Sequence, residues 1–233
     1  MKLIENNITQ TLDEIYLVET INLNNKTILE LGCGNASMTK QIAQNGFDRK
    51  IIACEVDEVQ HKKNLLLDIE NIEFKLCGAE NIDLEDESVD VIYMFKSFHH
   101  IPLELMSNAL DEISRVLKSN GLIYISEPLF AGEQNELISM FHDEEEVRQN
   151  AFNHIKDAVE NEKFKLFREI FFQSEVVYKD FEDFEKRQMN LTYNDNDISK
   201  ELKEKIKNKF NSFNEGKESS FMKPFRVDIL QKI

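Results

Sequence analysis

The chain has 233 residues, 41% of them hydrophobic and 31% charged, and its 44 acidic against 28 basic side chains give a net charge of -16. This apolar content predicts a folded chain, and only 7 Gly and 3 Pro exclude collagen-like and linker-rich classes. A surface this acidic repels phosphate groups, so nucleic acid and anionic membranes are not expected partners.

The first residues lack the apolar run of a signal peptide, and no stretch approaches the roughly 18 apolar residues that a membrane span needs. The three cysteines, Cys33, Cys54 and Cys77, show no CxxC spacing. We therefore expect them to be small packing residues in a reducing cytoplasm, without a disulfide framework or a metal site.

The first half of the chain alternates short β-branched runs with segments of helical period. The predicted strands are Thr27–Leu31, Lys50–Glu55, Ile72–Leu76, Asp90–Phe95 and Gly121–Glu127. The clearest helix is Leu103–Leu117, which repeats apolar residues every three or four positions and ends before Gly121. This alternation predicts an α/β fold with a mostly parallel sheet covered on both faces.

The second half is rich in phenylalanine and less regular. Helices are expected at 136–141, 144–160, 181–189 and 198–213, and strands at 165–178 and 225–231. We expect both late strands to join the same sheet, with the helices of 133–163 laid over its edge. A separate C-terminal domain is the alternative, but its strands would need partners of their own.

The most informative stretch is the glycine-rich turn after the first strand. Glu30 precedes Gly32, Cys33 and Gly34, and a helix begins near Ala36. Glycines allow a tight turn and let a ligand approach the bare main chain. The last position of a dinucleotide GxGxxG pattern is Ser37 here, and the Glu30 carboxylate would repel a pyrophosphate but attract a cation. The turn therefore suits S-adenosylmethionine, with its sulfonium and ammonium groups, better than NAD.

A second carboxylate, Glu55, ends the second strand roughly 20 residues later, where an acidic residue can bind ribose hydroxyls. Small residues after the third strand, in Cys77-Gly78-Ala79-Glu80, leave room for a flat base. His99 and His100 follow the fourth strand. Either could act as a general base at neutral pH, or the pair could simply lead into the next helix.

Taken in order, ELGCGNA, ACEVD, CGAENIDLEDESVDVIY, SFHHI and RVLKSNGLIYISEP resemble the class I, Rossmann-like S-adenosylmethionine-dependent methyltransferases, over roughly residues 27–128. The resemblance implies a doubly wound seven-stranded sheet of order 3-2-1-4-5-7-6 with strand 7 antiparallel. It implies one domain over 1–233: an N-terminal helical segment (1–26), a cofactor-binding core (27–128), a helical lid inserted after strand 5 (129–163) and the last strands and helices (164–233).

The same resemblance assigns roles around the cofactor. Gly32, Cys33 and Gly34 would line its methionine part, and Glu30 would orient its amino group through water. Glu55 would bind the ribose. Residues Val56, Ala79 and Glu80 would border the adenine, and Phe95 would contact the cofactor after strand 4. Two positions depart from the family pattern: Ala36 replaces its third glycine, and Gly78 replaces an acidic residue that holds the adenine amino group.

The expected reaction is in-line transfer of the methyl group to a small-molecule acceptor, leaving S-adenosylhomocysteine and relying mainly on positioning. His99 and His100 are the candidate catalytic residues, and no metal is expected; the acidic run 143–146 reads as a solvated helix start. Three alternatives stay open: a cofactor-binding regulatory or assembly protein without turnover, a methyltransferase acting on protein or RNA, and an NAD-dependent oxidoreductase.

Overall fold

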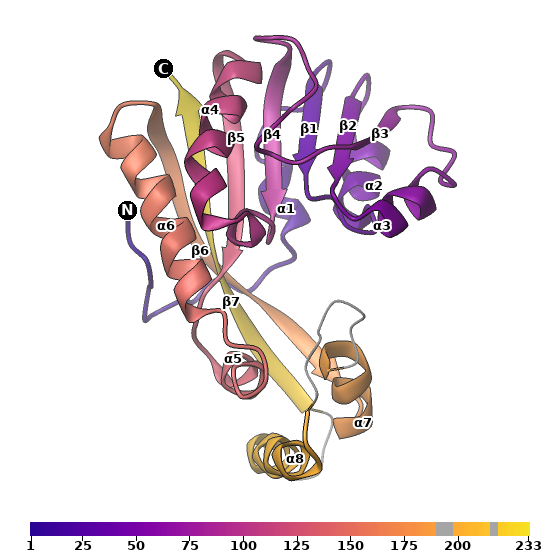
Figure 1. Cartoon of the computed structure of the whole chain (residues 1–233), viewed down its shortest axis with the longest axis vertical. Coiled ribbons are helices and arrows are strands. Elements are labelled where there is room, and N and C mark those ends of the chain that lie inside the picture. Colours follow the sequence, from indigo (N-terminus) through magenta and orange to yellow (C-terminus); the bar gives the residue numbers. More distant parts are fainter. Residues whose placement is uncertain (190–197, 215–218) are drawn as a thin grey trace.

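The computed structural model describes residues 1–189, 198–214 and 219–233. Seven strands form one sheet of order β3-β2-β1-β4-β5-β7-β6 (Figure 1). The strands are β1 (Thr27–Leu31), β2 (Lys50–Glu55), β3 (Ile72–Leu76), β4 (Val89–Phe95), β5 (Leu117–Pro128), β6 (Phe164–Tyr178) and β7 (Ser219–Lys232). The main helices are α1 (Ile15–Val18), α2 (Ser37–Gln44), α3 (Glu58–Asn64), α4 (Met106–Val116), α5 (Glu133–Ile138), α6 (Glu145–Glu160), α7 (Phe181–Phe184) and α8 (Lys200–Asn214).

The predicted strand order is confirmed. Strands β1 to β5 pair in parallel, and β7 runs antiparallel to both β5 and β6. The order reverses between β1 and β4, so the carboxyl ends of the parallel strands flank a switch point, where ligands bind in folds of this kind.

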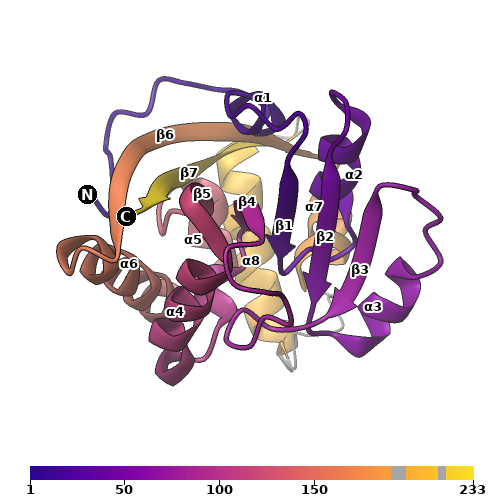
Figure 2. The same ribbon diagram turned by 90° about the horizontal axis from the view of Figure 1, so that it is seen from above.

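Two apolar layers sandwich the sheet because successive strand residues point to opposite faces. Leu29, Ile92 and Met94 face the side covered by α4 and α6. Ile28 and Tyr93 face the side covered by α1 and α2. Figure 2, seen from above, shows these helices on either side of the strands.

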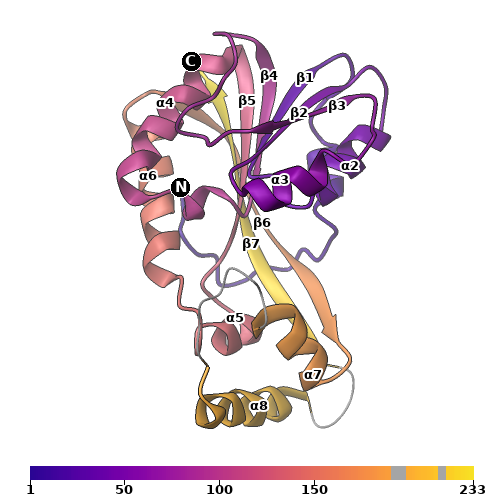
Figure 3. The same ribbon diagram turned by 45° about the vertical axis from the view of Figure 1, so that its right-hand side comes forward.

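A third apolar cluster lies away from the main sheet. The far halves of β6 and β7 extend beyond the other strands, and α5, α7 and α8 pack around them (Figure 3). Tyr178, Phe184, Phe210 and Phe221 form its centre, with ring centroids 5.2 to 6.3 Å apart. The late phenylalanines are therefore mainly core residues, and the late strands join the main sheet as expected.

Two sequence expectations need correction. The N-terminal segment 1–26 contains a single four-residue helix, α1, and otherwise has almost no regular secondary structure; Thr11 forms a bridge with Gln173 of β6. Strand β5 begins at Leu117 rather than Gly121: Leu117 pairs with Val89 of β4, and pairing resumes at Leu122 after an irregularity. The insertion 129–163, predicted to be a helical lid, is anchored through α6, whose Ala151, Ile155 and Ala158 are part of the main core; closure over a ligand stays a prediction.

No helix in the described parts of the chain combines the length and the apolar character that crossing a membrane requires.

The third cluster provides a test of this layered arrangement. Ile206 of α8 is fully buried in it, so Ile206→Ala should lower the free energy of unfolding of that region by about 2–5 kcal/mol. Hydrogen exchange should show faster exchange in α8 and in residues 219–224 of β7, which precede the part of β7 that pairs with β5, with the amides of β1 and β4 unchanged. The exposed neighbour Lys207→Ala is the matched control. Equal loss of protection throughout the sheet would contradict a separate cluster.

Candidate functional site

The turn after β1 is shaped by left-handed residues. Gly32 and Gly34 have φ of 74° and 53°, and Ala36 at 59° precedes α2. The N–H groups of Gly32 and Cys33 donate to the carbonyl of Cys54 at 3.0 and 2.9 Å. A Cβ on Gly32 would lie 2.6 Å from Ser97 Cβ, whereas a Cβ on Gly34 would meet nothing within 4 Å. Gly32 thus allows close packing, and Gly34 leaves its main chain open to a ligand.

Glu30 lies beneath this turn with only 2% of its surface exposed. Its Oε2 accepts a hydrogen bond from Thr39 Oγ1 at 2.6 Å. Burial raises the pKa of the Glu30 carboxyl to about 7, against the opposing effects of Thr39 and the Lys96 charge. The group therefore titrates near neutrality, and a nearby cation would favour its charged form.

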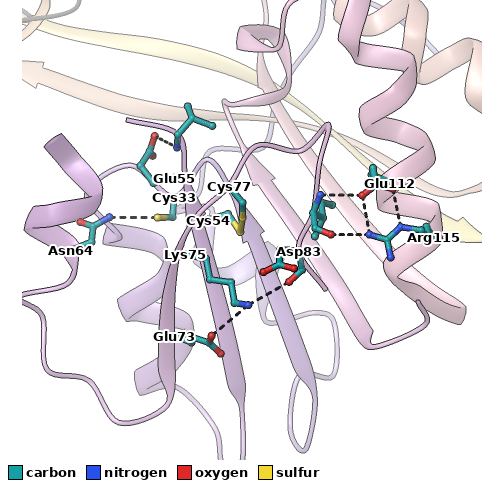
Figure 4. Close-up of a disulfide and its surroundings, with 12 residues drawn as sticks. Cys33, Cys54, Glu55, Asn64, Glu73, Lys75, Cys77, Asp83, Glu112 and Arg115 are labelled. Atoms are coloured by element: carbon teal, nitrogen blue, oxygen red, sulfur yellow. Dashed lines mark hydrogen bonds and ion pairs between the residues drawn. A yellow bond between two sulfur atoms is a disulfide. The ribbon is translucent and has the colours of Figure 1, made fainter. Parts of the chain in front are cut away.

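Glu55 connects the ends of β1 and β2. Its Oε2 accepts from the Gly34 N–H at 2.7 Å, and its Oε1 accepts from the N–H groups of Val56 and Asp57 at 2.8 and 2.9 Å. A carboxylate offers about four acceptor positions, so one on Oε2 is left for a ribose hydroxyl. Asn64 of α3 secures the other side of the turn by donating to the Gly34 carbonyl at 2.7 Å and to the Cys33 sulfur at 3.6 Å (Figure 4).

The residues predicted to border the adenine lie on the neighbouring strand ends. Val56 is 64% exposed, and Ala79 is buried. The Glu80 carboxylate folds back over Gly78 and fills the space that a side chain at 78 would take. Glu80 thereby supplies an acidic group where the family pattern has one and this sequence has glycine.

Two predicted cofactor residues have their side chains in the protein interior. The Phe95 ring is 7% exposed and packs against Tyr93 and Tyr124, with centroids 5.3 and 5.7 Å away. The Cys33 thiol is buried, and burial, with the charges of Glu30 and Glu55, raises its pKa. Both residues can meet a ligand only through their main chains or their edges.

The other two cysteines correct the sequence expectation. Cys54 and Cys77 form a disulfide that joins the end of β2 to the segment after β3, with a Cα–Cα distance of 5.3 Å (Figure 4). Adjacent parallel strands bring the two residues together although they are 23 positions apart. Only the strand register could have revealed this pairing.

A cavity of about 570 Å³ opens beside the carboxyl ends of β4 and β5. This volume is typical of small-molecule pockets, roughly 300–1,000 Å³. Its walls are formed by the segment after β4, by Pro128 of β5 and Lys223 of β7, and by the insertion between Ile138 and Asn150. His99 and His100 line it, as do several apolar side chains: Ile101, Leu103, Met106, Ile138, Phe141 and Val147.

The two histidines differ in environment. His99 is 4% exposed, and its Nδ1 is paired with Glu127 of β5. Burial lowers the pKa of His99, but the charges and hydrogen bonds of Glu127 and Glu144 outweigh burial and raise it to about 9. Partial desolvation and the charge on His99 lower the pKa of the more exposed His100. These shifts favour the protonated form of His99 and the neutral form of His100.

Sequence reasoning missed several residues of this cavity. Glu127 is the next-to-last residue of β5. Glu144 accepts a hydrogen bond from Arg148 at 2.5 Å, so the acidic run 143–146 is not merely solvated. Lys96, at φ 57°, and Lys223 also line the cavity; burial and the like charges of Lys96 and Arg148 lower the pKa of Lys223 to about 8. The sequence could have indicated Lys96 and Glu127 as site residues, because both lie at the carboxyl ends of predicted strands.

Comparison with known proteins agrees with this geometry. A family model described as a methyltransferase domain matches residues 29–125. An uncharacterized methyltransferase of Schizosaccharomyces pombe is 38% identical over 113 residues, covering 47% of this chain and 39% of that protein. The chain spans about two fifths of the length of the curated relatives that it matches.

Two solved structures show the same fold. The BH2331 protein of Bacillus halodurans matches with a TM-score of 0.66 at 17% identity, covering 94% of this chain and 98% of that chain. The cyclase SpnF matches with a TM-score of 0.60 at 14% identity, covering 94% and 78%. The predicted resemblance to class I methyltransferases is confirmed over residues 29–125, and the predicted Rossmann-like sheet is confirmed for nearly the whole chain.

The Glu55 carboxylate can be tested by titration with S-adenosylmethionine. Glu55→Ala removes a charge-assisted acceptor of the ribose, so calorimetry should show affinity weaker by about 1.5–3 kcal/mol, or roughly 10- to 150-fold. Glu58→Ala, an exposed carboxylate at the start of α3, is the control. A thermal melt verifies that the turn still folds, and an unchanged dissociation constant for a folded Glu55→Ala protein would remove Glu55 from the ribose site.

Glu30 predicts a pH dependence of the same binding. Its pKa of about 7 lies above the ordinary value of 4.5, so the carboxyl is neutral below pH 7 and charged above it. A cationic ligand favours the charged form, so affinity should rise from pH 6 to pH 8 and binding should release protons. Calorimetry in buffers of different ionisation enthalpy measures this release. Glu30→Gln should abolish it, and a wild-type affinity that falls over this range would reverse the assignment.

Proposed function

We propose that this chain, whose residues 29–125 match the family model of a methyltransferase domain, transfers a methyl group from S-adenosylmethionine to a small molecule bound in the 570 Å³ cavity. The observation that carries the proposal is the placement of two sites on one sheet edge. The turn of Gly32 to Gly34, with the carboxylates of Glu30 and Glu55 beside it, lies at the ends of β1 and β2. The cavity begins directly after β4 at Lys96.

The residues at the turn fit the cofactor chemically. Glu30 offers a carboxylate to the positive end of the molecule, and the open main chain at Gly34 allows close approach. Glu55 offers an oxygen to the ribose, and Val56, Ala79 and Glu80 border the base. When bound, the cofactor supplies an activated methyl group on a positively charged sulfur.

The chain's own contribution is mainly to align the acceptor and exclude water. An in-line displacement with a neutral leaving thioether needs orientation, which can contribute about 7–11 kcal/mol to lowering a barrier. The apolar side chains of Leu103, Met106 and Val147 provide a dry wall for the acceptor. We propose that His99 and His100 act on the acceptor, since both face its cavity.

Calorimetry with three ligands tests the cofactor. S-adenosylmethionine and S-adenosylhomocysteine should each bind with one-to-one stoichiometry, and NAD should not. The reaction is then tested with methyl-labelled S-adenosylmethionine and pools of small metabolites, by following label in the products. Binding of NAD alone would favour the oxidoreductase alternative.

A cofactor-binding protein without methyl transfer is the second candidate. It is favoured by one observation: the cyclase SpnF shares this fold over 94% of the chain, so the fold alone does not determine the reaction. Tight S-adenosylmethionine binding without labelled product from small-molecule, protein or RNA pools would support it.

Filling the cavity separates the acceptor site from the cofactor site. Val147, 41% exposed at the cavity wall, can be replaced by tryptophan. Val147→Trp should lower turnover about 10- to 100-fold by displacing the acceptor, with the dissociation constant of S-adenosylmethionine unchanged. Val177→Trp, on a similarly exposed residue of β6, is the control. Unchanged turnover in Val147→Trp would show that the acceptor binds elsewhere.

A further inference from the structure

Three of the five histidines of the chain gather at one wall of the cavity, together with Glu144. His99 and His100 belong to the turn after β4, and His142 and Glu144 belong to the loop between α5 and α6. Donor atoms of His99, His100 and Glu144 lie within 4.8 Å of one another. Histidine and carboxylate side chains converging in this way form the common ligand set of transition-metal sites.

His99, the buried member of the group, is held by a carboxylate on the ring nitrogen that points away from the cluster. Glu127 binds Nδ1 of His99, which leaves the Nε2 atom facing the cluster. Glu127 is itself fixed, because its Oε1 accepts from the N–H groups of Phe98 and His99 at 3.0 and 3.4 Å. A carboxylate on the rear nitrogen of a histidine is the arrangement that orients metal-binding imidazoles.

Glu144 is oriented by the same principle. Arg148, one turn later in α6, holds the Oε2 atom, so the Oε1 atom faces the histidines. This Oε1 lies 3.7 Å from His99 Nε2 and 3.0 Å from His142 Nε2. Two ligands about 2.1 Å from a tetrahedral ion stand about 3.4 Å apart, so these spacings suit a shared ion.

We propose that His99 Nε2, a ring nitrogen of His100 and Glu144 Oε1, with His142 alongside, bind a divalent transition-metal ion in the wall of the cavity. Mixed nitrogen and oxygen donors suit Zn²⁺, Co²⁺ or Fe²⁺, whereas Mg²⁺ and Ca²⁺ prefer oxygen alone. The ion takes the place of the proton on His99 and of the hydrogen bond between His142 and Glu144.

The three donor residues line the cavity, so an ion held by them would have open positions toward it, which would suit an acceptor with a hydroxyl oxygen. This part rests on the proposed function. An alcohol bound to the ion would lose its proton to water more readily. The oxygen lone pair then forms a bond to the methyl carbon, and the carbon–sulfur bond breaks, with its electron pair remaining on sulfur as a neutral thioether.

A metal titration of the full chain tests the site without any acceptor. After treatment with a chelator, the protein should bind one equivalent of Co²⁺, with visible ligand-field absorption, and Zn²⁺ should displace the Co²⁺. Mg²⁺ should produce no binding signal. Glu144→Gln and His100→Ala should each weaken Co²⁺ binding at least about tenfold, and Glu127→Gln about 10- to 100-fold.

Two matched variants make the result interpretable. His154→Ala, a histidine of α6 that bonds to the Asn150 carbonyl, should bind Co²⁺ like the wild type. Glu55→Ala should also bind Co²⁺ normally while binding S-adenosylmethionine more weakly, so failure of the cofactor site cannot be mistaken for failure of the metal site. Thermal melts identify any variant that does not fold.

Two outcomes would overturn the metal site: a folded wild-type chain that shows no Co²⁺ spectrum, or one whose Co²⁺ binding survives in both Glu144→Gln and His100→Ala. Either result would leave His99 paired with Glu127 and Glu144 and carrying no ion.

Discussion

The hydrogen bond from the Gly34 N–H to the Glu55 carboxylate fixes the position of the turn after β1 relative to β2, and the other features of this sheet edge depend on it. It joins the turn after β1 to the end of β2 at 2.7 Å. The carboxylate cannot swing away, because Val56 and Asp57 hold its other oxygen. A charged acceptor on several main-chain donors is a strong and directional link. In this arrangement, the space beside the Gly34 Cα is free of other atoms, and the Glu30 side chain is buried under the turn.

The turn after β1 and the cavity after β4 lie on opposite sides of the switch point between β1 and β4. Most of the residues that we propose bind the cofactor lie on the β1–β2–β3 side, and the cavity lies on the β4–β5 side. Lys96 stands between them in a left-handed conformation, close enough to influence the charge of both Glu30 and Lys223. A non-glycine residue in the left-handed region is strained, and such strain persists only where the surrounding structure imposes it. Strained residues of this kind cluster at functional sites. The layout allows one bound molecule to face another.

The insertion after β5 serves two purposes. Its long helix α6 is a permanent part of the core, through Ala151, Ile155 and Ala158. Its preceding loop carries His142 and Glu144 into the cavity wall. The family model ends at residue 125, near the end of β5, so this insertion and the acceptor site that we propose beside it lie outside the matched segment. A cyclase has the same fold, so the fold alone does not determine the reaction.

Local sequence determined a great deal here. The alternating periods of the first half placed β1, β2 and β3 at their observed ends, and the glycines beside Glu30 marked the tight turn that we propose binds the cofactor. Such features depend on neighbours in the chain, through main-chain preferences and side-chain periodicity. Tertiary structure decided what depends on strand register and on packing between distant segments. It brought Cys54 to Cys77, folded Glu80 over Gly78 and buried the Phe95 ring. It also set Glu144 beside His99. No local pattern predicts which loop lies next to which strand end, because that depends on the packing of segments distant in the chain.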